Sequence, residues 1–146
     1  MKIGQHADWG IAIARVVVGA VFAAHGAQKL FTFGIGATTQ GFSQAGIPLA
    51  TIVAPAVALI EFLGGLALIL GLGTRIAAGL LAMVMVGAIF FVHLRGGFFL
   101  PSGVEFALTL FATNVAFVLA GPGALAVDRM FHRTDRAERS TVQKAA

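Results

Sequence analysis

The chain alternates between long apolar segments and short stretches that carry glycine, proline or charged residues. Four apolar segments stand out, at residues 9–31, 51–72, 76–92 and 106–127. Each is close to the ~20 residues that a helix needs to cross the hydrocarbon core of a bilayer. Apolar runs this long and uniform favour helices over strands. The pattern therefore predicts an all-α fold, an integral membrane bundle of four transmembrane helices.

The connections between these segments differ in kind. Gly71, Gly73 and Thr74 predict a tight turn, so the second and third helices should form an antiparallel hairpin. Residues 32–50 make a longer link that is rich in glycine and threonine, and it either lies in the membrane interface or folds back against the bundle. Pro122, which stands between two glycines, predicts an early end to the fourth helix.

Composition supports a membrane protein and excludes several kinds of site. Hydrophobic residues make up 58% of the chain and charged residues 11%, where soluble domains carry about 25% charged residues. A soluble core of this size could not cover so much apolar surface, so the remainder must face lipid. The chain has no cysteine, which excludes disulfides, thiolate metal sites and covalently attached haem. No covalently bound cofactor is expected.

The basic residues predict an orientation. Four spans place both termini on one side of the membrane, and that side receives eight of the ten basic residues: Lys2, Arg15, Arg75, Arg129, Arg133, Arg136, Arg139 and Lys144. The positive-inside rule then predicts cytoplasmic termini in a bacterial-type inner membrane. The expected division is a membrane domain at 1–128 and a basic cytoplasmic tail at 129–146. Anionic lipid headgroups explain the charge better than nucleic acid does.

One carboxylate lies deep in the predicted bundle. Glu61 is near the middle of the second segment, where an unpaired charge in lipid would be costly. Arg15 and His25 lie on the first segment, each ~7 Å from its midpoint at 1.5 Å per residue. Either side chain could reach Glu61. The pair with Arg15 would be a structural ion pair, or part of a proton relay or headgroup site.

The first segment also presents a single face to the bundle. Helical spacing aligns five of its residues along one inward stripe: Arg15, Gly19, Phe22, Gly26 and Lys29.

A second group of polar residues is expected at the outer ends of the helices: His25, Lys29, His93, Arg95 and Glu105. His93 with Glu105 could hold a quinone headgroup or transfer protons. The alternative is a belt of interfacial salt bridges in which the long side chains extend outward. The spacings match no compact metal motif, so no metal site is predicted.

Several segments, in this order and spacing, resemble the DoxX family of small four-helix membrane proteins: HGAQKLF at 25–31, GIP at 46–48, EFLGGLALILGLGTR at 61–75, HLRGGFF at 93–99, GVEFALTL at 103–110 and GPGALAVD at 121–128. The resemblance covers nearly the whole chain and implies a multi-pass inner-membrane protein associated with membrane redox assemblies. It draws attention to seven residues of the matching motifs: His25, Lys29, Glu61, Arg75, His93, Glu105 and Asp128.

Together, the residues and the resemblance favour an auxiliary membrane subunit of a quinone-linked oxidoreductase complex, without an evident redox cofactor of its own. Quinone is the expected non-covalent ligand, with candidate proton or quinone residues at Glu61, Arg15, His25, Lys29, His93 and Glu105. Membrane lipid and either other integral subunits or further copies of this chain are the expected partners. The alternative is a small stand-alone transporter or lipid-handling protein.

Overall fold

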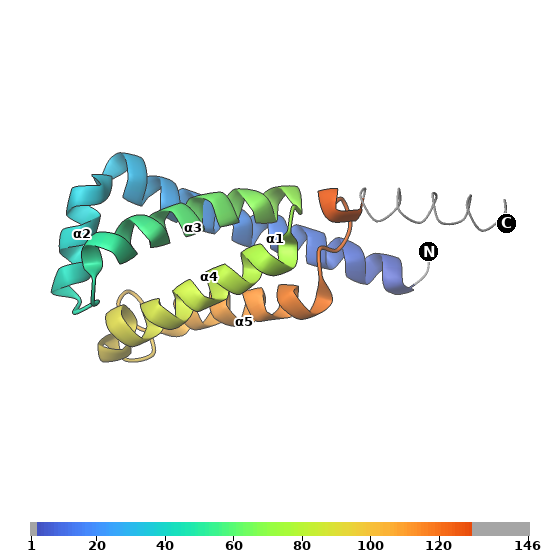
Figure 1. The fold of residues 1–146 in the computed structure, drawn as a ribbon. Coiled ribbons are helices and arrows are strands. Elements are labelled where there is room, and N and C mark those ends of the chain that lie inside the picture. Colours follow the sequence, from blue (N-terminus) through green and yellow to red (C-terminus); the bar gives the residue numbers. More distant parts are fainter. Residues whose placement is uncertain (1–2, 130–146) are drawn as a thin grey trace, which may run out of the picture.

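The computed structural model describes residues 3–129, which form a helical bundle (Figure 1). The predicted tail at 129–146 therefore lies outside the described residues except for Arg129. The elements in chain order are α1 (Ile3–Ala27), a π-helical turn η1 (Gln28–Thr32), α2 (Gly34–Gln44), α3 (Ala50–Leu70), α4 (Thr74–Ala88), a π-helical turn η2 (Ile89–His93), a 3₁₀ turn η3 (Leu94–Gly96) and α5 (Glu105–Ala120).

The long helices have the dimensions of membrane spans. Within the described residues, Gly4–Thr32, Ala50–Leu70 and Thr74–Gly96 are long and apolar enough to cross a bilayer. The fourth apolar helix, α5, is shorter than the predicted segment 106–127, because it ends at Ala120. Gly121 and Gly123 adopt positive φ values of 86° and 67° on either side of Pro122, which lacks an N–H for a continuing helix. Three long apolar helices and one shorter one thus make a multi-pass membrane protein.

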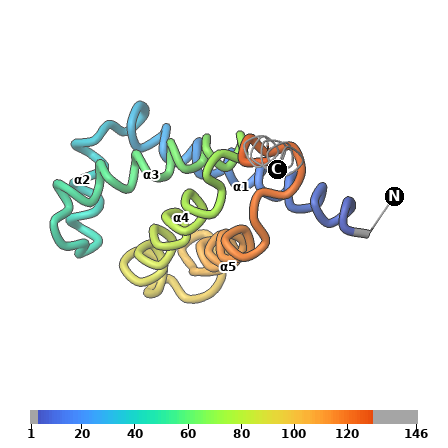
Figure 2. The backbone as a smooth tube through the Cα atoms, turned by 45° about the vertical axis from the view of Figure 1, so that its right-hand side comes forward, coloured from blue at the N-terminus to red at the C-terminus, as the bar shows by residue number. Residues whose placement is uncertain are grey.

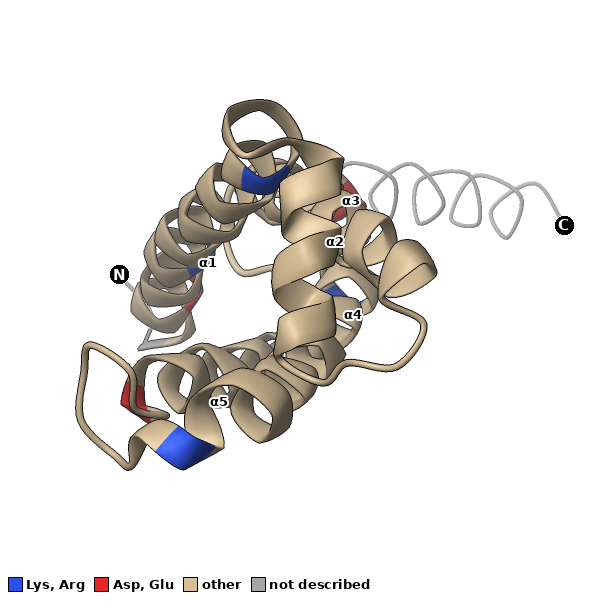
Figure 3. Ribbon diagram, turned by 90° about the vertical axis from the view of Figure 1, so that its left-hand side faces the viewer, with Lys and Arg blue, Asp and Glu red and all other residues tan. Residues whose placement is uncertain are grey.

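The helices associate as two neighbouring pairs. α1 packs along α3 and α4 along α5, and α3 also contacts α4 (Figure 2). The turn between α3 and α4 uses Gly71 and Gly73 with positive φ values of 67° and 55°, which confirms the predicted hairpin. Seen end-on, the bundle carries few charged residues along its length (Figure 3).

Glycines allow α1 and α3 to approach closely. A Cβ at Gly19 would lie 2.7 Å from the carbonyl oxygen of Gly65, so neither helix could accept a side chain there without moving. Gly26 lies directly against the backbone of Phe62. Arg15 and Phe22 of the same stripe are each only 1% exposed, and Lys29 also turns toward α3. The predicted inward stripe of α1 is therefore confirmed.

The long link between the first two spans folds back, and much of it is helical. α2 crosses the end of the bundle and contacts α3 and η1 (Figures 1 and 3). Its only buried residue is Thr38, whose hydroxyl donates to the carbonyl oxygens of Gly34 and Lys29 at 2.9 and 3.1 Å. Contact with α3 and η1 supports this helix, although it contains three glycines, which have low helical propensity.

The described ends of the chain meet at the opposite end of the bundle. The Ala124 amide donates to the carbonyl oxygen of Asp8 at 2.9 Å, and Arg129 forms a salt bridge of 2.8 Å with the Asp8 carboxylate. The prediction that both ends of the membrane domain share a side is therefore confirmed. Their cytoplasmic location remains a prediction.

Candidate functional site

The most deeply placed charged pair joins Lys29 of η1 to Glu61 of α3. The Lys29 Nζ atom lies 2.5 Å from Glu61 Oε2, and the two side chains are 20% and 5% exposed. Glu61 stands near the middle of a helix long enough to span a bilayer. A charge at that depth is expensive unless it is paired, so the lysine stabilises the carboxylate where lipid alone would not.

Local backbone structure places Lys29 at this depth. The last turn of the first span widens into a π-helix, which the bond from the Phe33 amide to the Gln28 carbonyl oxygen closes at 2.9 Å. The Thr38 hydroxyl holds the carbonyl oxygen of Lys29 from α2. Phe31 packs edge-on against Phe62, with ring centroids 5.7 Å apart. Short π-helical insertions of this kind are frequent at functional sites.

The pair retains hydrogen-bonding capacity. Among residues 3–129, Lys29 donates only to Glu61 Oε2, and the second Glu61 oxygen accepts no hydrogen bond. An ammonium has three donors and a carboxylate two acceptor oxygens. The fully enclosed, unpartnered side-chain atoms of the described chain are Arg15 Nε, Thr74 Oγ1 and Asn114 Oδ1. Glu61 Oε1 is not one of them, so this unpartnered oxygen is not fully enclosed by the described residues.

The expected contact between Arg15 and Glu61 is wrong. The Arg15 guanidinium instead donates to carbonyl oxygens at the end of α3 and in the segment after α5, those of Leu68, Ile69 (3.1 Å), Ala124 (3.4 Å) and Leu125 (3.1 Å). The last carbonyls of a helix have no partner within it and attract cations. Arg15 therefore closes the end of the bundle where the segment after α5 meets the start of α1, and it takes no part in the Glu61 pair.

Asp128 completes the closure at that end. Its carboxylate accepts hydrogen bonds from the Gly73 and Thr74 amides at 2.6 and 3.0 Å, and its own amide donates to the Gly71 carbonyl oxygen at 3.0 Å. A carboxylate on the first amides of α4 satisfies donors that the helix itself leaves unpaired. The Asp128 side chain thus caps the N-terminus of α4 from a distant part of the chain, next to the N-cap residue Gly73.

Two further predicted site residues, His93 and Glu105, lie on either side of the loop between η3 and α5. His93 Nδ1 lies 3.2 Å from the Ser102 carbonyl oxygen, and Glu105 accepts a hydrogen bond of 2.7 Å from the Leu100 amide. Each therefore has a loop backbone partner, and the suggestion that the two residues together hold a quinone headgroup or transfer protons stays a prediction. Both contacts shape the loop between η3 and α5, which contains a cis peptide bond before Pro101.

His25 takes another position from the one expected. Its ring faces Phe106 of α5, with centroids 6.4 Å apart, so the expected contact with Glu61 is wrong. The described residues contain no group of three His, Asp or Glu side chains placed to hold a metal ion. Thr109 and Asn114, whose types suit contacts between helices, donate instead to carbonyls of their own helix.

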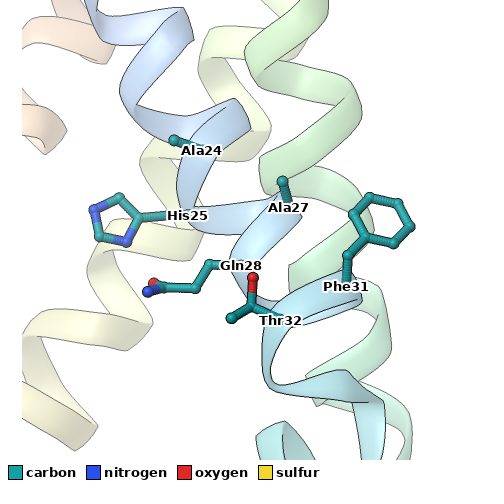
Figure 4. Close-up of a pocket in the computed structure, with 6 residues that line it drawn as sticks. All are labelled: Ala24, His25, Ala27, Gln28, Phe31 and Thr32. Atoms are coloured by element: carbon teal, nitrogen blue, oxygen red, sulfur yellow. The ribbon is translucent and has the colours of Figure 1, made fainter.

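A shallow pocket of about 370 Å³ lies on the flank of α1 and η1 (Figure 4). Six residues line it: Ala24, His25, Ala27, Gln28, Phe31 and Thr32. In the close-up, His25 and Gln28 project to one side and Phe31 to the other. Neither Lys29 nor Glu61 lines this pocket, so it is separate from the buried pair.

Sequence reasoning selected Glu61 and Lys29 but did not pair them, and it missed Thr38. The signal for Lys29 was present, because the helical stripe already placed it on the same face of α1 as Arg15. Periodicity gives a face but not the register of one helix against another, which is why Arg15 and His25, and not Lys29, were predicted to reach Glu61.

Comparison with known proteins identifies a family for this chain. The DoxX family model matches residues 10–94. A Haemophilus influenzae "Uncharacterized protein" is 37% identical over 136 residues, which cover 90% of this chain and 98% of that protein. The Bacillus subtilis "Putative oxidoreductase CatD" is 35% identical over 82% of this chain and 84% of its own length.

A third relative is named as a membrane protein. The Mycobacterium tuberculosis "Uncharacterized membrane protein Rv3486" is 35% identical over 79% of this chain and 77% of its own length. No solved structure matches the chain. The family match spans more than half of the residues, including Lys29, Glu61 and the α3–α4 hairpin, and the helices have the length and polarity of membrane spans. This chain belongs to the DoxX family of multi-pass membrane proteins.

Proposed function

We propose that this chain is an auxiliary membrane subunit of a quinone-linked electron-transfer complex, in which the Lys29–Glu61 pair forms a polar site for a quinone headgroup or a proton. The observation that carries the proposal is the buried pair itself, with Nζ and Oε2 2.5 Å apart in the membrane-spanning part of the bundle. Ionisable residues at such depth commonly mark proton or ligand paths.

The redox context is supported by a relative. The Bacillus subtilis protein that aligns over 82% of this chain bears the name "Putative oxidoreductase CatD". The present sequence has no cysteine with which to bind an iron–sulfur cluster or attach a haem covalently. An auxiliary role, with the electron-transferring cofactors held by partner subunits, reconciles the relative's name with this composition.

The surface of the bundle suits membrane partners. Large apolar side chains are exposed along every long helix, among them Ile13, Leu63, Met83 and Leu119 at 64%, 57%, 74% and 74%. Lipid tails and the helices of another subunit are both apolar enough to cover them. The basic residues near the termini support placement of that end at the cytoplasmic face of an inner membrane.

The proposal is tested with membrane vesicles from cells that lack the gene and are complemented with variants. Quinone-linked oxygen consumption should fall on deletion, return with the wild-type gene and stay low with Glu61→Gln at an equal protein level. Thr113→Val is the matched control, because the Thr113 hydroxyl bonds only within its own helix and its loss should leave the rate unchanged. Full activity of Glu61→Gln would contradict the proposal.

One observation favours the alternative of a small transporter. Glu61 lies near the middle of the membrane-spanning helix α3, and ionisable residues at that depth also mark the substrate and ion pathways of transporters. Uptake of a solute into liposomes by the purified protein, abolished by Glu61→Gln, would support the alternative over the auxiliary subunit.

A further inference from the structure

The Lys29–Glu61 pair carries information about the ligand it can accept. Its net charge is zero when the lysine is protonated and the carboxylate ionised. An anionic headgroup would meet the Glu61 carboxylate, and a cationic one would meet the Lys29 ammonium, each in surroundings where like charges interact strongly. A neutral headgroup avoids both repulsions. This favours a neutral polar ligand over the phosphate of a lipid.

The unused groups of the pair are of two kinds. Within residues 3–129, Lys29 has N–H donors without an acceptor, and Glu61 has one oxygen without a donor. The lysine side chain is 20% exposed and the Glu61 side chain is 5% exposed, so the pair is more open on the lysine side. A ligand that both accepts and donates a hydrogen bond would therefore satisfy Lys29 and Glu61 together. A ligand that only accepts would satisfy Lys29 alone.

We infer that the pair distinguishes the two redox forms of a quinone and binds the reduced form, the quinol, more tightly. This inference rests on the proposed function, which assigns a quinone to the site without choosing a form. A quinone ring offers only carbonyl acceptors, which Lys29 can satisfy. A quinol hydroxyl can accept from Lys29 and also donate to the free oxygen of Glu61.

The size of the preference follows from the extra hydrogen bond. A hydrogen bond to a charged group in a buried position corresponds to about tenfold or more in affinity. A tenfold preference for the reduced form would raise the midpoint potential of the bound two-electron couple by about 30 mV. A raised potential makes the bound quinone easier to reduce, so the site would suit a partner that delivers electrons to quinone, without itself transferring electrons.

The test measures binding by the full-length purified chain in nanodiscs under anaerobic conditions, with decylubiquinol and decylubiquinone as separate titrants. Wild-type protein should bind the quinol at least about tenfold more tightly. In Glu61→Gln the ratio should fall toward one, because the anionic acceptor is gone. Gln28→Ala is the matched control, since Gln28 neighbours Lys29 in sequence but lines the separate flank pocket, and it should keep the wild-type ratio.

Equal affinities for the two forms in the wild-type protein would overturn the inference without reference to any variant. Loss of the preference in Gln28→Ala but not in Glu61→Gln would also overturn it, and would move the site to the flank pocket. Displacement of the quinol by vesicles rich in anionic phospholipid, but not by neutral ones, would show a phosphate site instead.

These outcomes separate the inference from the proposed function. Quinol-selective binding with unchanged respiration on gene deletion would retain the site and reject the auxiliary role. Impaired respiration with equal affinities would do the reverse.

Discussion

At the scale of single residues, the identity of a cation's partner depends on what each end of the bundle offers. Arg15 and Lys29 share one stripe of α1, yet Arg15 meets carbonyl oxygens and Lys29 meets a carboxylate. The planar guanidinium has five donors and can serve several carbonyls at once, whereas the ammonium acts as a compact point charge. Glu61 could be selected from the sequence by its depth. Its partner could not, because register between helices is a tertiary property.

The first prediction concerns the energetics of the buried pair. Lys29→Met should destabilise the protein by about 3–5 kcal/mol, because it leaves Glu61 buried without a counter-charge. The double variant Lys29→Met/Glu61→Met should recover much of that loss, since neither charge then remains in the apolar interior. Equilibrium unfolding in detergent, followed by circular dichroism, provides the comparison. A Lys29→Met protein as stable as wild type would show that the pair is not coupled in solution.

The second prediction concerns the remote cap of α4. Asp128→Asn should cost about 1–2 kcal/mol, because the carboxylate accepts hydrogen bonds from the amides of the N-cap residue Gly73 and the first helical residue Thr74. Asp8→Asn is the matched control. It disrupts only the salt bridge with Arg129, whose two side chains are 48% and 36% exposed, and should change stability by less than about 1 kcal/mol. The same unfolding measurement decides, and equal losses for the two variants would contradict the assigned cap.

At the scale of helices, the length of the apolar segments predicted the membrane spans well, whereas the glycine-rich link did not reveal its helix. The predicted segment 51–72 corresponds to Ala50–Leu70, and 76–92 corresponds to α4 with its π-helical extension. α2 was missed as a helix because its glycines and threonines have low propensity, and its contact with α3 and η1 supplies the stability instead. The early end of α5 was predictable from the Gly-Pro-Gly sequence at 121–123.

The third prediction addresses the contact between α1 and α3. Gly19→Ala should destabilise the bundle by about 1–3 kcal/mol, because the added methyl group would meet backbone atoms of α3 that cannot yield without moving the helix. Gly87→Ala is the control, since no atom lies within 4 Å of a Cβ at Gly87. It should be neutral or stabilise by about 0.5–1 kcal/mol through helix propensity. Thermal denaturation of the two variants in one detergent gives the comparison, and a neutral Gly19→Ala would refute close contact.

At the scale of the whole molecule, the two ends of the bundle have different characters. One end is tied together by Arg15, Asp128 and the contact between Asp8 and Ala124. The other contains two π-helical turns, the crossing helix α2 and the Lys29–Glu61 pair. Sequence patterns located the charged residues of both ends. Sequence patterns could not predict the contacts of the segment after α5, because these contacts join residues more than 50 positions apart.

The closed end and the apolar flanks of the bundle therefore have different structural roles. A closed end fixes the relative positions of α1, α3 and α4, which helps to hold Lys29 and Glu61 in register. The exposed apolar flanks then remain available for lipid or for the helices of a partner.

Native mass spectrometry of the tagged protein, gently extracted from its own membranes, tests the proposal that this DoxX-family chain is a subunit of a quinone-linked complex. We predict a complex that contains redox subunits and a quinone adduct, and loss of the adduct in Glu61→Gln. A monomer or homo-oligomer that carries only lipid would contradict the claim.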